Sequence, residues 1–429
     1  MIAKILLDKK RVGHALGTAE IREFIDGFTN GDIPDYQMAA MAMAICCRGM
    51  NERETADLTD VMMRSGRCLD WGELMTADKH STGGVGDKLS LVIQPLAAAC
   101  GVAVPSLTGR GLGITGGTAD KLETIPGYSC SQTLERFQEI TRSVGVSMAV
   151  QTDEITPADK KLYALRDVTG TVASIPLIVA SILSKKLAEG AGTLVFDVKC
   201  GKGAFMKTPD EARTLATALV AGAKSAGRKA AALVTGMDAP LGHAVGNANE
   251  VSEAIEVLRG RKEPYVGLCV EFAATMVSLA KCIALEEARE LCRTRLADGS
   301  AYARFESMVA EHGGDLERFG RLLKKPTFRF KIQAMRSGYV SAIDAEKVGR
   351  VALMLGAGRE QAGDTIDPLA GIALAVGVGD KVSVGQPLAT LEKSTDPDGL
   401  ERAAAELYKA FQVSTEPVEC PPLILERID

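Results

Sequence analysis

The sequence predicts an α/β protein in three parts: a helical domain, a larger α/β domain with a mostly parallel sheet, and a C-terminal α+β module. Helical periodicity dominates the start of the chain, and short apolar runs alternate with helical patterns from about residue 75. Strand-like alternation around glycine turns follows Arg329. With 429 residues the chain exceeds what one hydrophobic core usually supports, so several domains are expected.

The first 66 residues are expected to form helices. Residues 20–25 carry an apolar stripe at helical spacing, and residues 51–54 match a capping box before the next helix. The run Tyr36–Cys47 is dense in methionine and alanine and is apolar nearly all round, as expected of a helix buried on two sides. It is a candidate subunit interface, and an ordinary buried core helix is the alternative.

An α/β layer is expected from about residue 75. Residues 194–199 and 231–234 have the composition of buried strands, and their alternation with helical patterns is typical of a mostly parallel sheet. A helical insert interrupts this layer, with Pro176 in its first turn. The expected limits are 1–66 for the helical domain, 75–155 and 194–330 for the α/β domain, about 160–190 for the insert, and 336–429 for the C-terminal module.

Composition and charge exclude several classes of function. The formal net charge is −5 and no run of lysine or arginine occurs, which argues against nucleic acid or an anionic membrane as a partner. The ten cysteines form no Cys-x-x-Cys pair, so no zinc or redox motif is supported, and they fit a reducing cytoplasm. The N-terminus is too short and too charged for a signal peptide, and no segment has eighteen unbroken apolar residues.

The most informative motif is a loop of small residues from Asp78 to Ser90. It directs bare backbone N–H groups, hydroxyls and a lysine at one point, which is the chemistry of a phosphate cradle. The spacing of Gly86-Asp87-Lys88 does not match a P-loop. His80 lies in this motif and is one of only four histidines. A proton-donor role is therefore weighed against a glycine-rich turn with a satisfied core histidine.

A second loop of small residues follows, from Thr108 to Glu123. It contains Gly-x-Gly-x-x-Gly at residues 111–116, but Pro126 comes too soon for the crossover helix of a dinucleotide fold. Two such loops within about forty residues instead suggest one anion site lined from both sides. Taken alone, Thr118 is more typical of a helix N-cap.

A third segment, from Asp159 to Lys186, is basic and helical. Ser181 and Lys185 are four residues apart and share one helix face, whereas Lys186 points elsewhere, so only one of the two lysines can join Ser181. A solvated face is the simplest interpretation. A serine, a lysine and an arginine such as Arg166 can also hold a planar heterocycle by hydrogen bonds to its edge.

These segments occur in the same order and spacing in one family, the thymidine and pyrimidine-nucleoside phosphorylases, which the chain resembles over essentially its whole length. The resembling segments are Lys79–Asp87, Gly109–Glu123, the Arg166 segment, Ser181–Lys185, Ile33–Ala40, Gly203–Lys207, Pro240–Gly242 and Ala244–Asn247. The resemblance implies a homodimer and a nucleoside phosphorylase/phosphoribosyltransferase-like fold, in which about 160–190 completes the helical domain. The active site would lie in the cleft between the helical and α/β domains.

The resemblance also implies roles for individual residues. Catalysis would rest on His80, beside O2 of the pyrimidine, with Arg166 and Lys185. Phosphate would bind at Lys79, Ser81, Ser90, Thr108 and Thr118. The pyrimidine would be held by Arg166, Ser181 and Lys185, against an apolar wall near C5 formed by Leu112, Val172, Ile178, Ile182 and Phe205.

Three positions depart from the family pattern. Thr108 stands where serine is usual but keeps the hydroxyl, Ile114 stands where histidine is usual, and Ser106 stands near the expected ribose site, where lysine or methionine is common. No organic cofactor is implied. Some relatives bind a monovalent cation such as K⁺, and the matching positions here are Gly86, Lys88, Leu241, Ala244 and Glu253, mostly through backbone carbonyls.

The function expected from the resemblance is reversible phosphorolysis of pyrimidine nucleosides to free base and (deoxy)ribose 1-phosphate. Thymidine is favoured because the C5 wall is apolar and position 106 holds no lysine. The alternatives are a broad uridine, thymidine and cytidine phosphorylase, an enzyme like anthranilate phosphoribosyltransferase, and a catalytically silent binding paralogue, which Ile114 keeps open. An anthranilate enzyme would need ligands for magnesium pyrophosphate and leaves Arg166, Ser181 and Lys185 unexplained.

Overall fold

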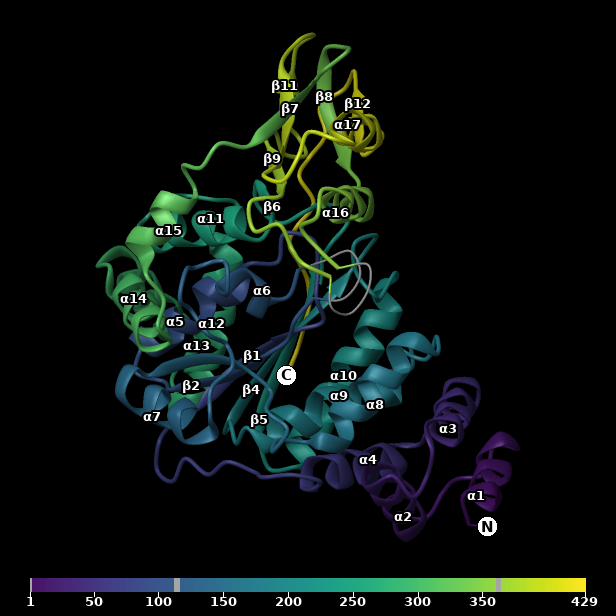
Figure 1. The fold of residues 1–429 in the computed structure, drawn as a ribbon. Coiled ribbons are helices and arrows are strands. Elements are labelled where there is room, and N and C mark those ends of the chain that lie inside the picture. The colour runs from purple at the N-terminus through teal and green to yellow at the C-terminus, as the bar shows by residue number, and fades with distance from the viewer. Residues whose placement is uncertain (1, 112–115, 360–363) are drawn as a thin grey trace.

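The computed structural model describes residues 2–111, 116–359 and 364–429, and it has the three parts that the sequence predicts (Figure 1). The helical part contains α1 (Ile2–Arg11), α2 (Thr18–Asn30), α3 (Asp35–Arg48) and α4 (Glu52–Arg64), joined by α8 (Pro157–Val168) and α9 (Ile175–Ala188). Because α9 packs on α4 and α8 packs on α2, these two helices share the apolar core of the helical part.

Local sequence signals fix the start of α4. The side chain of Asn51 accepts from the backbone N–H of Glu54 at 2.8 Å, and the Glu54 carboxylate accepts from the backbone N–H of Asn51 at 3.0 Å. The predicted capping box is therefore confirmed. The same carboxylate pairs with the buried Nζ of Lys10 at 2.8 Å, which ties α4 to α1.

Six strands form the central layer. β3 (Val146–Val150) pairs with β2 (Val104–Thr108), and a bridge between Thr76 and Ala103 joins β2 to β1 (Ala77–Ser81). β1, β4 (Thr193–Cys200), β5 (Lys229–Gly236) and β13 (Ile424–Ile428) follow in that order. All these pairings are parallel except that of β13 with β5, so the mostly parallel sheet is confirmed. The carboxyl ends of β1, β2, β3 and β4 consequently meet at one edge of the sheet.

Helices cover both faces of this sheet (Figure 1). α5 (Leu89–Ala99) and α12 (Val266–Lys281) pack on one face, and α9 and α10 (Pro209–Ser225) pack on the other. The strand alternation of β4 serves both faces, because Leu194 and Phe196 join the core of α9 and α10 while Val195 joins the other core. The remaining helices of the α/β part are α6 (Thr118–Leu122), α7 (Leu134–Val144), α11 (Ala248–Leu258), α13 (Leu285–Ala297), α14 (Ser300–Glu311) and α15 (Leu316–Leu322).

The C-terminal part contains two small sheets, with strand orders β6-β9-β11-β7 and β10-β8-β12. Its elements are β6 (Ala244–Gly246), β7 (Phe328–Gln333), β8 (Gly338–Ile343), α16 (Ala345–Met354), β9 (Gly371–Leu374), β10 (Lys381–Val382), β11 (Pro387–Lys393), α17 (Leu400–Tyr408) and β12 (Phe411–Ser414). Strands cross between the parts in both directions, since β6 comes from the α/β segment of the chain and β13 returns to the central sheet. The domain limits expected from the sequence stay predictions.

Within the described chain, no helix has both the length and the apolar character that a bilayer crossing requires.

Candidate active site

The first glycine loop, residues 82–88, begins at the carboxyl end of β1 and runs into the N-terminus of α5. The Ser81 hydroxyl donates to Oδ2 of Asp87 at 2.6 Å and accepts from the backbone N–H of Gly83 at 3.1 Å. Gly83 has a φ of +88°, a conformation that favours glycine. Ser90 lies in the first turn of α5, where helix N–H groups favour an anion. The structure therefore places the hydroxyls of Ser81 and Ser90 at the two ends of one tight loop.

Lys79 lies beneath this loop and is fully buried. Its Nζ is 2.9 Å from Oδ2 of Asp197, and Nζ of Lys199 is 2.8 Å from the same oxygen. Burial opposes the charge of Lys79, but the carboxylates of Asp197 and Asp87 outweigh it and raise the pKa of Lys79. Burial likewise opposes ionisation of Asp87, but Lys199 and Lys79 hold its pKa well below the ordinary value. Direct contact of Lys79 with phosphate stays a prediction, because its ammonium group is already paired with Asp197.

The second glycine loop, residues 109–117, begins after Thr108 at the carboxyl end of β2 and leads into α6. The N-cap of α6 is Gly117, and Oδ2 of Asp120 accepts from the backbone N–H groups of Gly117 (3.1 Å) and Gly111 (2.6 Å). The N-cap interpretation of Thr118 is therefore wrong: Thr118 is the first helical residue. A Cβ on Gly117 would lie 2.3 Å from the Gly111 nitrogen, so only glycine fits.

Leu112 and Ile114 fall outside the described residues, so their roles stay as the resemblance gives them.

Arg166 is buried on α8, and backbone carbonyls hold its side chain. Its Nε donates to the carbonyl of Thr171 at 3.2 Å, Nη1 to Leu177 at 3.0 Å and Nη2 to Val172 at 2.7 Å. Burial lowers the pKa of Arg166, although nearby Asp159 favours the charge. No carboxylate forms an ion pair with Arg166 in the part of the chain that the structure describes. Its charge is thus not neutralised by an ion pair, although the residue is only 1% exposed; its contact with the base stays a prediction.

Lys185 and Lys186 diverge, as their spacing predicts. Nζ of Lys185 donates to the Ser181 hydroxyl at 2.9 Å and to the Asp159 carboxylate at 2.5 Å. Nζ of Lys186 instead enters the core, where it pairs with Asp78 at 2.5 Å. The side chains of Lys185 and Lys186 are only 21% and 2% exposed, so the solvated-face interpretation is wrong.

His80 is on β1, and the charges of lysines from both β1 and α9 act on it. Burial and the charges of Lys186, Lys185 and Lys79 hold the pKa of His80 well below its ordinary value. The imidazole is therefore neutral at neutral pH and can donate one N–H. No hydrogen bond from another described residue reaches its ring, and His80 is only half-buried, so His80 is not a satisfied core histidine. The charges of Lys186, Lys185 and Lys79 all act on it.

The expected apolar wall is only partly assembled. Ile178 and Ile182 lie one turn apart on α9, the helix that also carries Ser181 and Lys185. Val172 is half-buried, and its carbonyl holds Arg166. Phe205, in the segment after β4, has 57% of its surface exposed. Its contact with a base stays a prediction.

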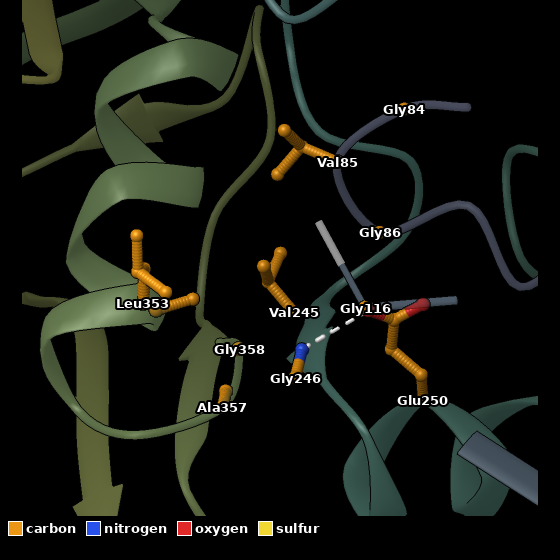
Figure 2. A pocket seen from close by; sticks show the side chains of 11 residues that line it. Gly84, Val85, Gly86, Gly116, Val245, Gly246, Glu250, Leu353, Ala357 and Gly358 are labelled. Atoms are coloured by element: carbon orange, nitrogen blue, oxygen red, sulfur yellow. Dashed lines mark hydrogen bonds between the residues drawn. The ribbon is translucent and has the colours of Figure 1, made fainter. Parts of the chain in front are cut away.

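A pocket lined by residues of both glycine loops and of the C-terminal part does not suit phosphate. Figure 2 shows Val85 and Val245 facing Leu353, with Glu250 below them. Its walls are formed by Gly84, Val85, Gly86, Gly116, Val245, Gly246, Glu250, Ala352, Leu353, Ala357 and Gly358. Among these described residues none is a lysine or arginine, and the Glu250 carboxylate pairs with Lys121 at 2.8 Å. The pocket therefore offers no cationic side chain to an anion.

The residues implied for binding a monovalent cation do lie together. The cation that they surround, however, is the ammonium group of Lys88. Nζ of Lys88 donates to the carbonyls of Leu241 (2.8 Å) and Ala244 (2.9 Å) and to Oε2 of Glu253 (3.0 Å). These three oxygens belong to three of the five positions expected around K⁺. A K⁺ ion at their centre would lie against the ammonium group, so the residues present do not fit a bound K⁺ ion there.

Sequence reasoning missed the buried charges beneath the site. Asp197 pairs with both Lys79 and Lys199, and Glu189 shares Lys186 with Asp78. Burial holds the pKa of Glu189 well above its ordinary value. The available signal was charge inside an apolar run, since Asp197 and Lys199 interrupt a strand that is otherwise apolar. Fully buried charges are rare unless they are paired.

The helical bundle and the mostly parallel α/β part correspond to the two domains of a glycosyl transferase family, and this family defines the class of the protein. Residues 4–66 match the model of the glycosyl transferase family helical bundle domain, and residues 73–302 match that of the glycosyl transferase family a/b domain. Residues 339–414 match the pyrimidine nucleoside phosphorylase C-terminal domain.

Relatives of known name narrow the class to one family. The chain is 46% identical over 429 residues to the pyrimidine-nucleoside phosphorylase of Geobacillus stearothermophilus, covering 99% of each chain. It is 44% identical to the enzyme of that name from Bacillus subtilis, covering 98% of each. The chain belongs to the pyrimidine-nucleoside phosphorylase family.

The anthranilate phosphoribosyltransferase of Thermus thermophilus has a similar structure, with a TM-score of 0.60 and 22% identity, over 73% of this chain and 99% of that one. At this identity the likeness concerns the fold alone.

Proposed function

We propose that the protein catalyses the reversible phosphorolysis of pyrimidine nucleosides, in which nucleoside and orthophosphate give free base and pentose 1-phosphate. The observation that carries this proposal is His80 on β1, a half-buried imidazole at the start of the first glycine loop that burial and the charges of Lys186, Lys185 and Lys79 keep neutral. The names of the relatives support the same reaction.

Phosphate would bind beside the hydroxyls at the carboxyl ends of β1 and β2, and not in the pocket that Val85 and Val245 line. Backbone N–H groups and the N-terminus of α5 would bind its charge, with hydroxyls from Ser81, Ser90, Thr108 and Thr118. The buried ammonium of Lys79 would add a positive potential from below. One phosphate oxygen would then bond to C1′ of the pentose as the bond from C1′ to the base nitrogen breaks.

The base leaves with the electrons of the broken bond, so charge develops on its O2 and O4. Arg166, which has no carboxylate partner among the described residues, and Lys185, whose side chain is partly exposed beside Asp159, would stabilise that charge. A neutral His80 would donate its N–H to O2, and the anionic base then takes a proton from solvent. Water exclusion would follow closure of the helical part on the α/β part.

Thymidine is the proposed preferred substrate. Ile178 and Ile182 offer an apolar surface beside Ser181 that suits a C5 methyl group. Ser106 is 4% exposed and accepts from Nε2 of Gln94 at 3.2 Å, so this position supplies no cation to a ribose hydroxyl. A broad uridine, thymidine and cytidine phosphorylase is the alternative on the same site.

We further propose that the enzyme acts in the cytoplasm as a homodimer through its helical part. The ten cysteines are free thiols, which fits a reducing compartment. The exposed apolar side chains of α3, Tyr36 and Met43 among them, support the dimer. The reaction as written uses no organic cofactor.

One assay tests the proposed reaction and the proposed substrate preference. Thymidine, uridine, deoxyuridine and cytidine are each incubated with and without orthophosphate, and free base is followed by absorbance. We expect phosphate-dependent release of base, fastest from thymidine. A matched reaction with anthranilate and phosphoribosyl pyrophosphate is expected to give no product. The proposed reaction would be excluded if base were released at the same rate without phosphate. It would also be excluded if anthranilate were converted and no nucleoside were.

A further inference from the structure

Lys88 ends the first glycine loop, and its side chain is fully buried. Its Nζ donates to two backbone carbonyls, Leu241 and Ala244, and to one oxygen of Glu253, at distances from 2.8 to 3.0 Å. The ring of Tyr265 lies on another side, with its centroid 5.3 Å from Nζ. Every described group that contacts this ammonium is an acceptor or an aromatic face, so the surroundings form a cation cage.

Neighbouring backbone groups hold the cation cage in shape. The Glu253 carboxylate also accepts from the backbone N–H of His243 at 3.1 Å and of Ala244 at 2.6 Å, which fixes its orientation. Gly242 has a φ of +70°, and a Cβ there would lie 2.1 Å from Glu253 and 2.8 Å from Nζ of Lys88. A side chain at position 242 would therefore collide with both ends of the ion pair.

We propose that the Lys88 ammonium is a tethered monovalent cation that replaces K⁺ in this chain. The resemblance implies K⁺ at Gly86, Lys88, Leu241, Ala244 and Glu253, and carbonyl and carboxylate oxygens are the ligands that K⁺ takes. Here the side chain of one of those residues fills the position itself. Because the charge is covalently attached, its local concentration does not depend on the salt in solution. The protein consequently needs no bound K⁺ for stability or for phosphate binding.

The tether has a positioning role. Lys88 connects the first glycine loop to the segment that carries β6 and to α11, so both ends of the loop are held. The opposite end is held by Ser81 and Asp87. Gly86 approaches the same carbonyls, since a Cβ on it would lie 2.6 Å from the oxygen of Leu241. Loss of the cation from the cage would therefore loosen the N–H groups proposed to face phosphate.

The test compares two variants in KCl and in choline chloride at equal ionic strength. Lys88→Ala opens the cage to an ion, whereas Lys88→Met removes the charge but keeps most of the volume. We expect the Tm of Lys88→Ala to be low in choline and to rise with KCl concentration, as for an ion that binds the folded state only. The Tm of Lys88→Met should stay low in both salts. The wild type should have the same Tm and the same phosphate KM in both salts.

The phosphate KM of Lys88→Ala should be raised about tenfold in choline and recover in KCl, a coupling of ordinary size. Lys10→Ala is the matched control: it removes another buried lysine, but that lysine faces one carboxylate, Glu54, and no cage. Its Tm should fall without rescue by K⁺. A wild type that loses stability in choline, or a Lys88→Ala variant that K⁺ does not rescue, would overturn the proposal.

The KM measurement rests on the proposed function, but the Tm measurements do not. A protein without phosphorolysis activity would therefore leave the cation test intact.

Discussion

His80 and Arg166 show how burial sets the chemistry of single residues in this site. The imidazole lies near three lysines and gains no hydrogen bond from the described residues, so protonation is unfavourable. The guanidinium is buried without a paired carboxylate but donates to three carbonyls. One residue is therefore kept neutral and the other is kept charged, which suits a hydrogen-bond donor at O2 and a charge beside the leaving base.

The depressed pKa of His80 makes stability depend on pH. An unfolded histidine has a pKa near 6.5, whereas folded His80 lies well below that value. As pH falls below about 6.5 the unfolded chain takes up the proton and the folded chain does not, so the free energy of unfolding falls. One proton corresponds to about 1.4 kcal/mol per pH unit until the folded pKa is reached. The free energy of unfolding of His80→Gln should therefore fall less as the pH is lowered.

Denaturant unfolding of both proteins between pH 7 and pH 5 measures the difference. His312, whose pKa burial also lowers, is present in both proteins and cancels. Parallel pH curves for wild type and His80→Gln would contradict the assigned neutrality of His80.

Arg166→Ala and His80→Ala should separate catalysis from structure. Loss of one preorganised donor lowers kcat by about 10²–10³-fold, and we expect a fall of that size for Arg166→Ala. Loss of the His80 donor should lower kcat by about 10²-fold or more. The sequence suggests that both variants keep the fold. The structure qualifies this for Arg166, because its removal leaves the carbonyls of Thr171, Val172 and Leu177 without their donor.

We therefore expect a lower Tm for Arg166→Ala and an unchanged or higher Tm for His80→Ala, measured by calorimetry beside steady-state kinetics. Near-normal kcat in both variants would contradict the assigned roles.

At the scale of elements, the sequence predicts what local signals determine. The capping box at Asn51, the proline start near Pro176 and the apolar run of β4 each reflect short-range chemistry, and the structure confirms them. It does not predict β13 on the central sheet, because pairing between residues some 190 positions apart has no local signature. The same limit applies to Lys88: its sequence position suggested a carbonyl ligand, but only the fold brings Glu253 to its ammonium.

The packing of α8 against α9 positions Lys185, the lysine proposed to bind the base. Asp159 on α8 is 2% exposed and accepts from Lys185 on α9, which in turn contacts Ser181. Asp159→Asn should release the lysine and leave part of a buried pair unbalanced. We expect the nucleoside KM to rise about tenfold, equivalent to about 1.4 kcal/mol, with little change in the phosphate KM.

Asp167→Asn is the matched control, since Asp167 is on the same helix but exposed. Equal effects on both Michaelis constants, or an effect of the control as large as that of Asp159→Asn, would indicate a general loss of structure instead of a positioning role.

Across the whole molecule, the site combines loops from one edge of the sheet with helices from a different part of the chain. β1, β2 and β4 carry the glycine loops and the Phe205 segment, while α8 and α9 bring Arg166 and Lys185 from the helical part. Figure 1 shows α1 and α3 at the far end of that helical part, away from the C-terminal sheets. Because α3 packs on α8 and α9, a contact that holds α3 in place is expected to influence these two helices as well.

The exposed face of α3 is apolar and follows the helix axis. Met38, Met41, Ala42 and Ile45 face the core, whereas Tyr36, Ala40, Met43 and Cys47 form a stripe on the opposite face. Tyr36 is 73% and Met43 is 43% exposed, and Ile5 on the neighbouring α1 is 60% exposed. An exposed apolar stripe of this kind is typical of a surface that a second molecule covers. It supports the proposed homodimer through the helical part.

Sedimentation of a double variant, Tyr36→Lys with Met43→Lys, tests this interface. At a two-fold contact each introduced lysine would face the same patch on the partner subunit, so like charges would repel each other. In the monomer both lysines remain in water. We expect the wild type to sediment as a dimer and the variant as a monomer with an unchanged fold by circular dichroism. Met335→Lys is the matched control, because Met335 is 74% exposed on the C-terminal part and should leave the dimer intact. A monomeric wild type, or a variant that remains dimeric, would show that α3 is not the contact. Because α3 packs on α8, which carries Arg166, the monomeric variant should also lose affinity for the nucleoside. Its Tm should still be independent of K⁺, as proposed for the Lys88 cage.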